Sequence, residues 1–247
     1  MLLLITDVHC QYHLIDEQVA YAEQLCGQAV AQVVVLGDFG LFAHTLYDFF
    51  RRAGRRFARP VSFLEGNHEE FDAFADLVGE YRDCFTWLPR ASVHTLDGHR
   101  VLALGGAAYM DAMTTPRGCE IRAEDIAACL ALPAGSVDVV LSHDCPQGIG
   151  MTNAPGFGHF GPPGFAGGRE IAAHLQPRLW IFGHHHRWFD RTHGATRYLG
   201  LPESWKGFAL LGHHGDLRVI DHFLDSPSTF WSRLTTWCQR LLGRESS

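Results

Sequence analysis

The stretch that decides the fold is Leu2-Leu3-Leu4-Ile5-Thr6-Asp7-Val8-His9. Its run of four apolar residues predicts a strand that is buried on both faces, as in a sheet covered by helices. Asp7 and His9 follow directly where this strand ends. In open α/β sheets, ligand sites gather beyond the carboxyl ends of the strands. We therefore expect the strand to carry Asp7 and His9 to a binding site at one rim of a sheet.

The same pattern occurs at four later places in the chain. Each short apolar run is again a predicted buried strand, and each leads into residues that can bind a metal or carry a proton. The runs are Val33–Leu36, Val61–Leu64, Val137–Leu141 and Leu179–Phe182, and they lead into Gly37-Asp38, Gly66-Asn67-His68-Glu69, His143-Asp144 and Gly183-His184-His185-His186. Each block alone is common by chance. Five strand ends of this kind together predict one metal site.

The segments between these strands predict helices. Amphipathic patterns cover residues 14–28, 43–57, 69–78, 122–131 and 168–176, and one more buried strand is predicted at Val101–Leu104. This alternation of strands and helices is typical of a layered α/β fold. The last predicted strands, Arg197–Leu201, Gly207–Leu211 and Leu217–Ile220, indicate an antiparallel finish to a sheet.

The composition indicates a globular protein with its own core. The 247 residues are 47% hydrophobic and carry a formal net charge of −7. A general nucleic-acid binder is usually basic, so any contact with nucleic acid would be local. Because no linker or change in composition divides the chain, we expect a single domain over residues 1–225.

The cysteine pattern indicates the redox state of the cellular compartment. All seven are scattered, and no C-x-x-C pair occurs. This disfavours a disulfide framework and a zinc knuckle and favours a reducing compartment, so we expect a cytoplasmic protein. The apolar start is very short and lacks a basic region, unlike a signal peptide. No apolar stretch is long enough to be expected to span a bilayer.

Asp, Asn and His at one rim suit the hydrolysis of a phosphate ester. Such an ester is negatively charged and repels nucleophiles. Two divalent cations about 3.5–4 Å apart neutralise this charge and lower the pKa of a bound water, which supplies hydroxide near neutral pH. Ions this close need a shared anionic ligand. Mixed imidazole and carboxylate ligation suits Mn²⁺, Fe or Zn²⁺ better than Mg²⁺ or Ca²⁺.

The five blocks read D-x-H, G-D, G-N-H-[DE], H and G-H-x-H, and together the pattern resembles the calcineurin-like metallophosphoesterases. The resemblance covers about residues 7–186. It implies a four-layer α-β-β-α fold, in which a sandwich of two sheets is flanked by helices. It also implies a dinuclear centre with two divalent ions, for which we favour Mn²⁺, and hydrolysis through a metal-bridging hydroxide.

The resemblance also implies a role for each site residue. The implied ligands are Asp7, His9 and His186 for the first ion, Asn67, His143 and His184 for the second, and Asp38 as the bridge between them. His68 would lie just outside the metals, where it could stabilise the transition state or protonate the leaving oxygen. Asp38 and His68 are therefore the expected catalytic residues. His185 fills the variable position and is not expected to be a ligand.

Two further segments narrow the substrate. After the second strand the sequence continues as Phe39-Gly40-Leu41-Phe42, without the Asp and Arg of the G-D-x-x-D-R-G block of protein serine/threonine phosphatases. The segment 141–149, L-S-H-D-C-P-Q-G-I, is similar to the S-H-D-W-P-R-G-I block of RNA lariat-debranching enzymes. Those enzymes, however, have Cys where this chain has His9, and they carry a long C-terminal region. We therefore expect a compact relative of that group.

The substrate prediction favours a phosphodiester, with a nucleic acid or nucleotide as a candidate. A nuclease or nucleic-acid repair factor is a narrower version of this prediction. Two alternatives stay open: a phosphomonoester or phosphoprotein substrate at the same site, and a metal-binding scaffold that performs no chemistry. The filled ligand positions and His68 speak against the scaffold.

Several residues near the expected site have two readings each. Arg117 could bind a phosphate oxygen of the substrate bidentately or be a surface arginine. For Tyr109, packing in the core is favoured over stacking on a base. Asp144 could orient a ligand histidine, but capping a turn is slightly favoured. The Gly-, Pro- and Phe-rich segment 148–168 predicts a long loop, which we interpret as a lid.

Two features lie away from this site. The basic cluster comprises Arg51, Arg52, Arg55, Arg56 and Arg59. It could contact a nucleic-acid backbone, although a solvated face paired with acids is favoured. Residues 226–247 predict an amphipathic C-terminal helix. We expect it to dock on the domain or to form a homodimer contact.

Overall fold

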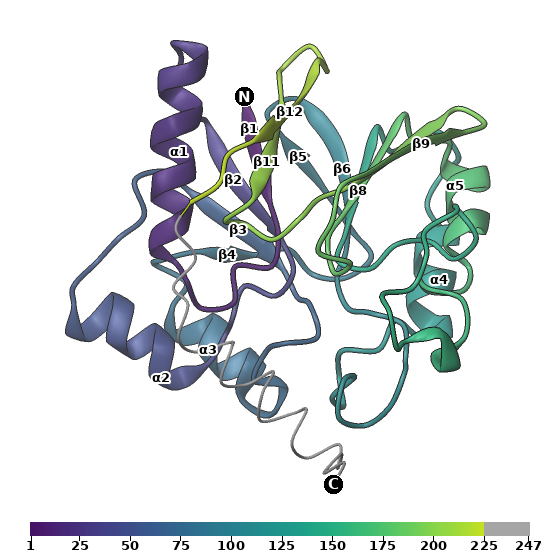
Figure 1. Ribbon diagram of the computed structural model, residues 1–247, viewed down its shortest axis with the longest axis horizontal. Coiled ribbons are helices and arrows are strands. Elements are labelled where there is room, and N and C mark those ends of the chain that lie inside the picture. The colour runs from purple at the N-terminus through teal and green to yellow at the C-terminus, as the bar shows by residue number, and fades with distance from the viewer. Residues whose placement is uncertain (225–247) are drawn as a thin grey trace, which may run out of the picture.

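Strand β1 (Leu2–Ile5) lies inside the first of two six-stranded sheets in the computed structural model, which describes residues 1–224 (Figure 1). The strand order is β12-β11-β1-β2-β3-β4. β1 runs parallel to β2 on one side and antiparallel to β11 on the other. The other strands of this sheet are β2 (Gln32–Leu36), β3 (Val61–Leu64), β4 (Thr86–Trp87), β11 (Gly207–Leu211) and β12 (Leu217–Asp221).

The second sheet contains the middle of the chain. Its strand order is β5-β6-β7-β8-β10-β9. β6, β7, β8 and β10 are parallel, and β5 and β9 pair antiparallel at the two edges. The bounds are β5 (Ser92–Leu96), β6 (His99–Leu104), β7 (Val139–Ser142), β8 (Leu179–Phe182), β9 (Phe189–His193) and β10 (Thr196–Gly200).

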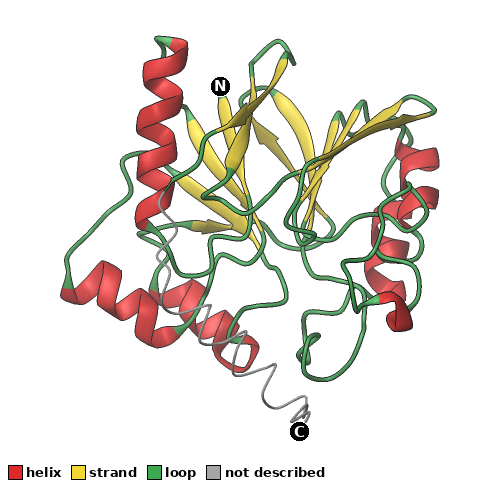
Figure 2. Ribbon diagram, viewed as in Figure 1, coloured by secondary structure: helices red, strands yellow, loops and turns green. Residues whose placement is uncertain are grey.

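Helices cover the outer face of each sheet (Figure 2). Beside the first sheet lie α1 (His13–Cys26), α2 (Ala43–Leu46) with its π-helical continuation Tyr47–Arg52, and the 3₁₀ turn Phe71–Ala73 with α3 (Phe74–Glu80). Beside the second sheet lie α4 (Ala123–Leu130) and α5 (Gly168–Leu175). The 3₁₀ turn Gly158–Phe160 is the one helical piece of the loop before α5.

The apolar side chains form three buried clusters, one between each pair of layers. In β1, Leu2 and Leu4 point into the cluster between the two sheets, whereas Leu3 and Ile5 point toward α1. The third cluster joins the second sheet to α4 and α5. Because both faces of the central strands are covered, these strands are apolar at most positions. The predicted four-layer α-β-β-α fold is confirmed.

The predicted helix boundaries differ from the observed ones in identifiable ways. The first helix ends at Cys26 because Gly27 adopts a left-handed conformation with φ of 66°. The helix predicted over 43–57 begins at Ala43, but it becomes a π-helix at Tyr47 and ends at Arg52. Segment 69–78 begins as a 3₁₀ turn, and its α-helix extends to Glu80.

The last three strands were predicted to finish one sheet in antiparallel order, and the structure divides them between the two sheets. β10 stays in the second sheet, parallel to β8, whereas β11 returns to the first sheet beside β1. Only β11 and β12 pair with each other in the predicted antiparallel way. The return of β11 brings both ends of the described chain into one sheet.

Within residues 1–224, no helix combines the length and hydropathy that crossing a membrane requires. The six cysteines of this range are all free thiols. The predicted helix at 226–247, and with it the predicted dimer contact, lies outside the described residues.

Candidate metal centre

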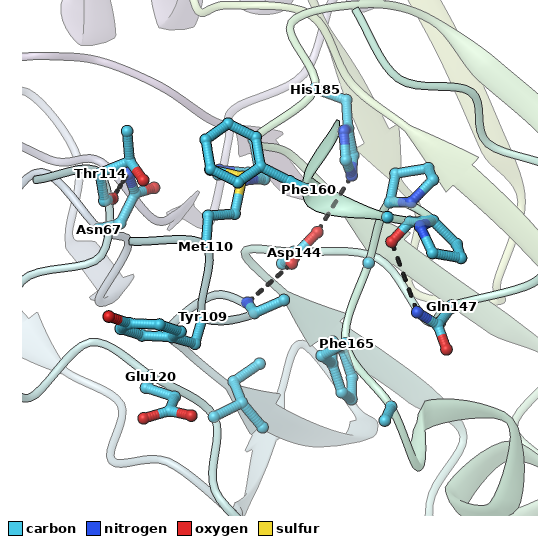
Figure 3. A pocket seen from close by; sticks show the side chains of 18 of the residues that line it. Asn67, Tyr109, Met110, Thr114, Glu120, Asp144, Gln147, Phe160, Phe165 and His185 are labelled. Carbon is cyan, nitrogen blue, oxygen red and sulfur yellow. Dashed lines mark hydrogen bonds and ion pairs between the residues drawn. The ribbon is translucent and has the colours of Figure 1, made fainter. Parts of the chain in front are cut away.

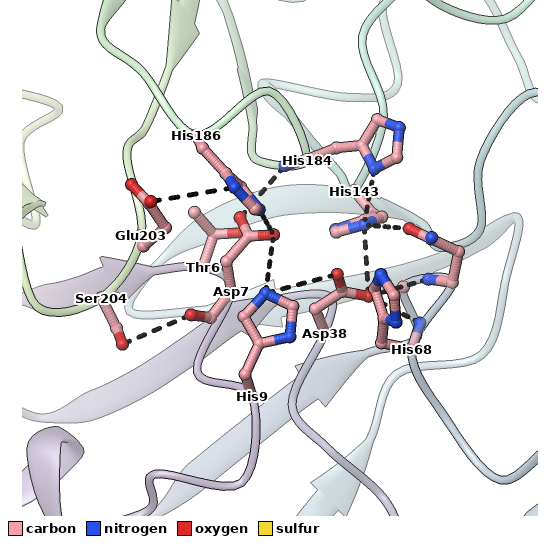
Figure 4. A network of polar contacts seen from close by, with 12 residues as sticks. Thr6, Asp7, His9, Asp38, His68, His143, His184, His186, Glu203 and Ser204 are labelled. Atoms are coloured by element: carbon pink, nitrogen blue, oxygen red, sulfur yellow. Dashed lines mark hydrogen bonds and ion pairs between the residues drawn. The ribbon is translucent and has the colours of Figure 1, made fainter. Parts of the chain in front are cut away.

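The predicted ligands lie on the loops that follow β1, β2, β3, β7 and β8. Figure 4 shows the carboxylates and imidazoles among them facing one another. The backbone is unusual at this rim. Five ligand positions have left-handed φ angles between 48° and 64°, namely Asp7, His9, Asp38, His184 and His186. Such angles are strained for residues other than glycine, and strain of this kind concentrates at functional sites.

Glycines provide the space for this rim. Gly37 has a φ of 90° and packs against the ring of His143. A Cβ atom on Gly66 would overlap the carboxylate of Asp38, and one on Gly183 would overlap the hydroxyl of Thr6. The tight approach expected beside the ions is therefore present, although only Gly37 among these three needs a left-handed backbone.

One half of the centre forms around Asp7. Its Oδ2 atom accepts hydrogen bonds from the Thr6 hydroxyl at 2.7 Å and the His184 backbone N–H at 3.1 Å. Its Oδ1 atom lies 3.1 Å from Nε2 of His186 and 3.8 Å from Nε2 of His9. The ligand atoms of Asp7, His9 and His186 all lie within 4.8 Å of one another, close enough to hold one cation.

Asp38 lies between the two halves. Its Oδ2 atom is 3.8 Å from Nε2 of His9, and its Oδ1 atom is 3.4 Å from Nε2 of His143. The backbone N–H groups of Asn67 and His68 donate to Oδ1 at 2.8 and 2.9 Å, which fixes the carboxylate. A second metal-sized group comprises Asp7, Asp38 and His143. Asp38 therefore has the position that a bridging ligand needs.

The other half brings together atoms of Asn67, His143 and His184 that can bind a metal. Nδ1 of His143 faces the Leu36 carbonyl at 2.8 Å and must donate to it, so Nε2 of the neutral ring carries a lone pair. This Nε2 lies 3.1 Å from Oδ1 of Asn67 and 3.2 Å from Nδ1 of His184. The Asn67 amide donates to the Thr114 carbonyl, which orients Oδ1 toward His143. A divalent cation satisfies all these lone pairs at once.

The protonation states of four of the ligands suit metal binding, whereas His186 must lose a proton to bind, because the Asp7 carboxylate outweighs burial and raises its pKa to about 9. Burial lowers the pKa of His9 and of His184 to about 4, so both rings are neutral near pH 7. Burial alone would raise the pKa of Asp38, but His143, His68 and His9 outweigh it and lower the pKa to about 2. Burial likewise opposes the ionisation of Asp7, yet His186 and other histidines hold its pKa well below the usual value. Ionised carboxylates and neutral imidazoles are the forms that bind metals.

His68 and Glu69 follow Asn67 and serve different purposes. The His68 ring lines the cavity above the centre, with its centroid 5.3 Å from that of His9. Glu69 is buried, and its carboxylate accepts the backbone N–H groups of Phe39 and Gly40, both at 3.0 Å, and of Leu41. It therefore fixes the loop that carries Asp38. The sequence analysis gave Glu69 no role, although its place in G-N-H-[DE] was the available signal.

Glu203 is a second residue that the sequence analysis missed. Its Oε1 lies 3.8 Å from Nδ1 of His186 and 2.8 Å from Nζ of Lys206. It follows β10 at the point where the chain returns to the first sheet, and no motif marks it.

A cavity of about 900 Å³ opens beside the centre. Asp38, Asn67 and His68 form its floor, and residues of the 148–168 loop line one wall. The loop therefore borders the site as predicted, whereas its motion as a lid stays a prediction. Tyr109 also lines the cavity and is 57% exposed, so the prediction that it packs in the core is wrong (Figure 3). Arg117 is exposed and is not among the lining residues, so its phosphate contact stays a prediction.

Asp144 fixes turns, the role slightly favoured for it from the sequence, and the histidine that it contacts is not a predicted ligand. Its carboxylate accepts the backbone N–H groups of Cys145 at 2.7 Å and Ala108 at 2.9 Å, which fixes two turns. It also lies 3.0 Å from Nε2 of His185, a residue of the cavity wall that was not a predicted ligand. Asp144, Cys145 and His185 are close enough to hold an ion. Hydrogen bonding between Asp144 and His185 accounts for the contact without one.

The basic cluster is a surface network, as favoured from the sequence. Arg51 and Arg56 pair with Asp83, Arg52 with Asp48, and Arg59 with Glu23. Arg55 lies over the Phe49 ring. Four of the five arginines are thus paired with acids, so the cluster gives little support to a nucleic-acid contact.

Comparison with known proteins agrees with this geometry. The chain is 22% identical over 233 residues to a lariat debranching enzyme of Entamoeba histolytica, covering 78% of this chain and 66% of that one. It is 26% identical over 181 residues to a probable cyclic nucleotide phosphodiesterase of Synechococcus, covering 68% and 67%. The chain thus spans about two thirds of the length of these relatives.

A solved structure supports the fold. The crystal structure of the protein TT1561 of Thermus thermophilus superimposes with a TM-score of 0.56 at 13% identity, over 89% of this chain and 97% of that one. The sequence profile of the calcineurin-like phosphoesterases matches residues 1–188. The chain therefore belongs to the calcineurin-like phosphoesterase family, the hydrolases that act on phosphate esters.

Proposed function

We propose that this protein is a dinuclear metal-dependent phosphodiesterase. The observation that carries the proposal is the convergence of seven ligand-type side chains from five strand ends, with Asp38 between its two halves. Two buried carboxylates at neutral pH need cations beside them, because burying an uncompensated charge is costly. A scaffold without chemistry would not need His68 at the cavity floor as well.

The donor set fits the proposed cofactor. Five imidazoles, two carboxylates and one amide line the centre when His68 is included, and this mixture suits Mn²⁺, Fe or Zn²⁺. We propose Mn²⁺. When bound, the two cations would neutralise the phosphate charge and lower the pKa of a coordinated water so that it can act as nucleophile.

The side chains of this protein have separable roles in the proposed reaction. Asp7, His9 and His186 would hold one cation, Asn67, His143 and His184 the other, and Asp38 both. The His68 ring would meet the substrate, because it lines the cavity beside the centre while its backbone N–H is held by Asp38. From there it can donate a proton to the leaving oxygen or a hydrogen bond to the phosphoryl oxygens.

Two observations favour a diester over a monoester. One relative is named as a cyclic nucleotide phosphodiesterase, although the similarity is distant. The cavity is also much larger than a phosphate group and continues past the centre along two loops, so it has room for a second organic group beside the one that a monoester also carries. The cytoplasmic localisation, the single domain over residues 1–225 and the dimer contact stay predictions.

The test compares bis-p-nitrophenyl phosphate with p-nitrophenyl phosphate at saturating Mn²⁺. We expect the diester to have the higher kcat/KM, and Asp38→Ala to remove turnover of both. Asp48→Ala is the matched control, because Asp48 is a half-exposed aspartate whose ion pair within residues 1–224 is with Arg52. A higher kcat/KM for the monoester would make the protein a phosphomonoesterase. Bound Mn²⁺ without hydrolysis of either ester would make it a scaffold.

A further inference from the structure

The cavity beside the metal centre is built for more than a phosphate. Its volume of about 900 Å³ is at the upper end of the ~300–1,000 Å³ found for small-molecule pockets. Two loops complete it, one after β6 that carries Tyr109 and Glu120, and one after β7 that carries Phe157 and Phe160. An organic group of the substrate therefore has a defined space next to the reacting phosphate.

Tyr109 is presented to this space by a well-anchored loop. The N–H of Ala108 donates to Asp144 at 2.9 Å, and the N–H of Met110 donates to the Thr115 hydroxyl at 3.0 Å. Backbone hydrogen bonds between Ala107 and residues 119 and 121 close the loop at its base. With both neighbours held, the Tyr109 ring is nevertheless 57% exposed. An exposed aromatic ring on a fixed loop beside an active site is typical of a binding surface.

Aromatic rings also occur on the second loop. Phe157 is 43% exposed and Phe160 also lines the cavity, with ring centroids 6.0 Å apart. Figure 3 shows Tyr109 and Phe160 on different loops around the same space. Flat aromatic surfaces of this kind bind flat ligand groups, because stacking buries both faces at little entropic cost.

Glu120 adds a negatively charged hydrogen-bond acceptor to the cavity. It lines the cavity, and Figure 3 shows its carboxylate near the Tyr109 ring. Among the described residues, none donates a hydrogen bond to this carboxylate or forms an ion pair with it. Arg90 donates to the Glu120 backbone carbonyl and directs its other N–H groups to Glu65, to Asp125 and to the backbone carbonyls of residues 118 and 119. The carboxylate can therefore accept N–H donors from a ligand.

We infer that this cavity binds the base of a nucleotide ester, stacked on Tyr109, with the amino edge of the base donating to Glu120. A nucleobase is the common phosphate-ester substituent that is both flat and edged with N–H donors. Guanine suits the site best, because its ring N–H and its amino group are parallel donors for one carboxylate. This inference deepens the proposed function and rests on it for the position of the phosphate.

The test is direct binding to the Mn²⁺-loaded full chain by isothermal titration calorimetry. GMP is compared with ribose 5-phosphate, which has the same sugar and phosphate but no base, and with IMP, which lacks the amino group. We expect GMP to bind at least about tenfold more tightly than ribose 5-phosphate, as stacking of one base supplies. IMP should fall between the two.

Variants assign this preference to the two residues. Tyr109→Ala should remove most of the advantage of GMP over ribose 5-phosphate, and Tyr109→Phe should keep it. Glu120→Gln should make GMP and IMP bind alike. Tyr47→Ala is the matched control, because Tyr47 is equally exposed, at 55%, but does not line this cavity. It should leave all three affinities unchanged.

The outcomes separate this inference from the proposed function. Equal binding of GMP and ribose 5-phosphate, or an unchanged GMP affinity in Tyr109→Ala, would overturn the inference even if bis-p-nitrophenyl phosphate is hydrolysed. A Tyr109-dependent preference for GMP in a protein that hydrolyses no ester would support the inference and count against the proposed function alone.

Discussion

Nε2 of His143 lies 3.1 Å from Oδ1 of Asn67, and in the neutral form of the histidine both atoms are acceptors. The orientation of each group is fixed from behind, by the Leu36 carbonyl for His143 and by the Thr114 carbonyl for Asn67. Two facing acceptors in a buried site repel each other unless a cation or a proton lies near both. This arrangement makes the fold itself sensitive to metal.

The first prediction is that Mn²⁺ stabilises the fold. A ligand at about one hundred times its Kd stabilises the native state by ~2.7 kcal/mol. For a domain of this size that is a rise in Tm of about 5–10 °C over protein treated with a chelator. Asn67→Ala should reduce this rise, as followed by differential scanning calorimetry. An equal rise in Asn67→Ala would exclude Asn67 from the metal site.

The second prediction concerns His68. His68→Ala should lower kcat on bis-p-nitrophenyl phosphate by about 10²–10⁴-fold, the range for a residue that transfers a proton in the transition state. The Mn²⁺ content, measured by atomic emission, should stay as in the parent protein, because His68 lines the cavity beside the centre and is not among the seven proposed ligands. Loss of metal together with activity would instead make His68 a ligand.

The rim of the site could be predicted because each of its parts is local in sequence. A buried strand and the polar residues that follow it are adjacent in the chain, as in Leu2–Ile5 with Asp7. Meeting of these strand ends then follows from the parallel order of the sheets. Strands without a continuous apolar run were missed. β5 alternates between half-buried and exposed residues, and four of the five residues of β9 are exposed.

Three features of the structure could not be predicted because they depend on contacts between distant parts of the chain. Tyr109 looks like a core residue, but the anchoring of Ala108 by Asp144 turns its ring toward the cavity. Which sheet β11 joins depends on its pairing with β1 and not on the residues of β11 itself. Glu69 has its role only because the loop after β2 lies over it.

The third prediction concerns pH in the metal-free protein. Burial would lower the pKa of His186, but the Asp7 carboxylate outweighs it and raises the pKa to about 9. A histidine whose pKa is raised by folding contributes stability that is complete below about pH 6.5, its unfolded value. This contribution is lost as the pH rises through about 9. The loss should be modest, because the side chain is 45% exposed and the pair is screened.

Thermal melts from pH 6 to pH 9.5 in the presence of a chelator measure this effect. The parent protein should lose Tm toward high pH, and His186→Ala should show a flatter profile. His44→Ala is the control, because His44 is a histidine of α2 away from the centre. Identical slopes in the parent and His186→Ala would mean that another group causes the pH dependence.

The last prediction is that Glu69 holds the loop that positions Asp38. Its buried carboxylate accepts the N–H groups of Phe39, Gly40 and Leu41, directly after Asp38, so Glu69→Ala leaves several buried donors unpaired. Each costs about 1–3 kcal/mol, so we expect a loss of roughly 3 kcal/mol or more in the free energy of unfolding. Glu70→Ala is the matched control, because Glu70 makes one exposed hydrogen bond, to Ala43. Urea unfolding measures the free energy of unfolding of both variants.

Glu69→Gln separates stability from positioning. This variant keeps one acceptor oxygen, so its free energy of unfolding should lie between those of Glu69→Ala and Glu70→Ala. Its affinity for Mn²⁺ should fall because the loop that holds Asp38 is less well fixed. If Glu69→Gln binds Mn²⁺ as the parent does, Glu69 stabilises the fold without positioning Asp38.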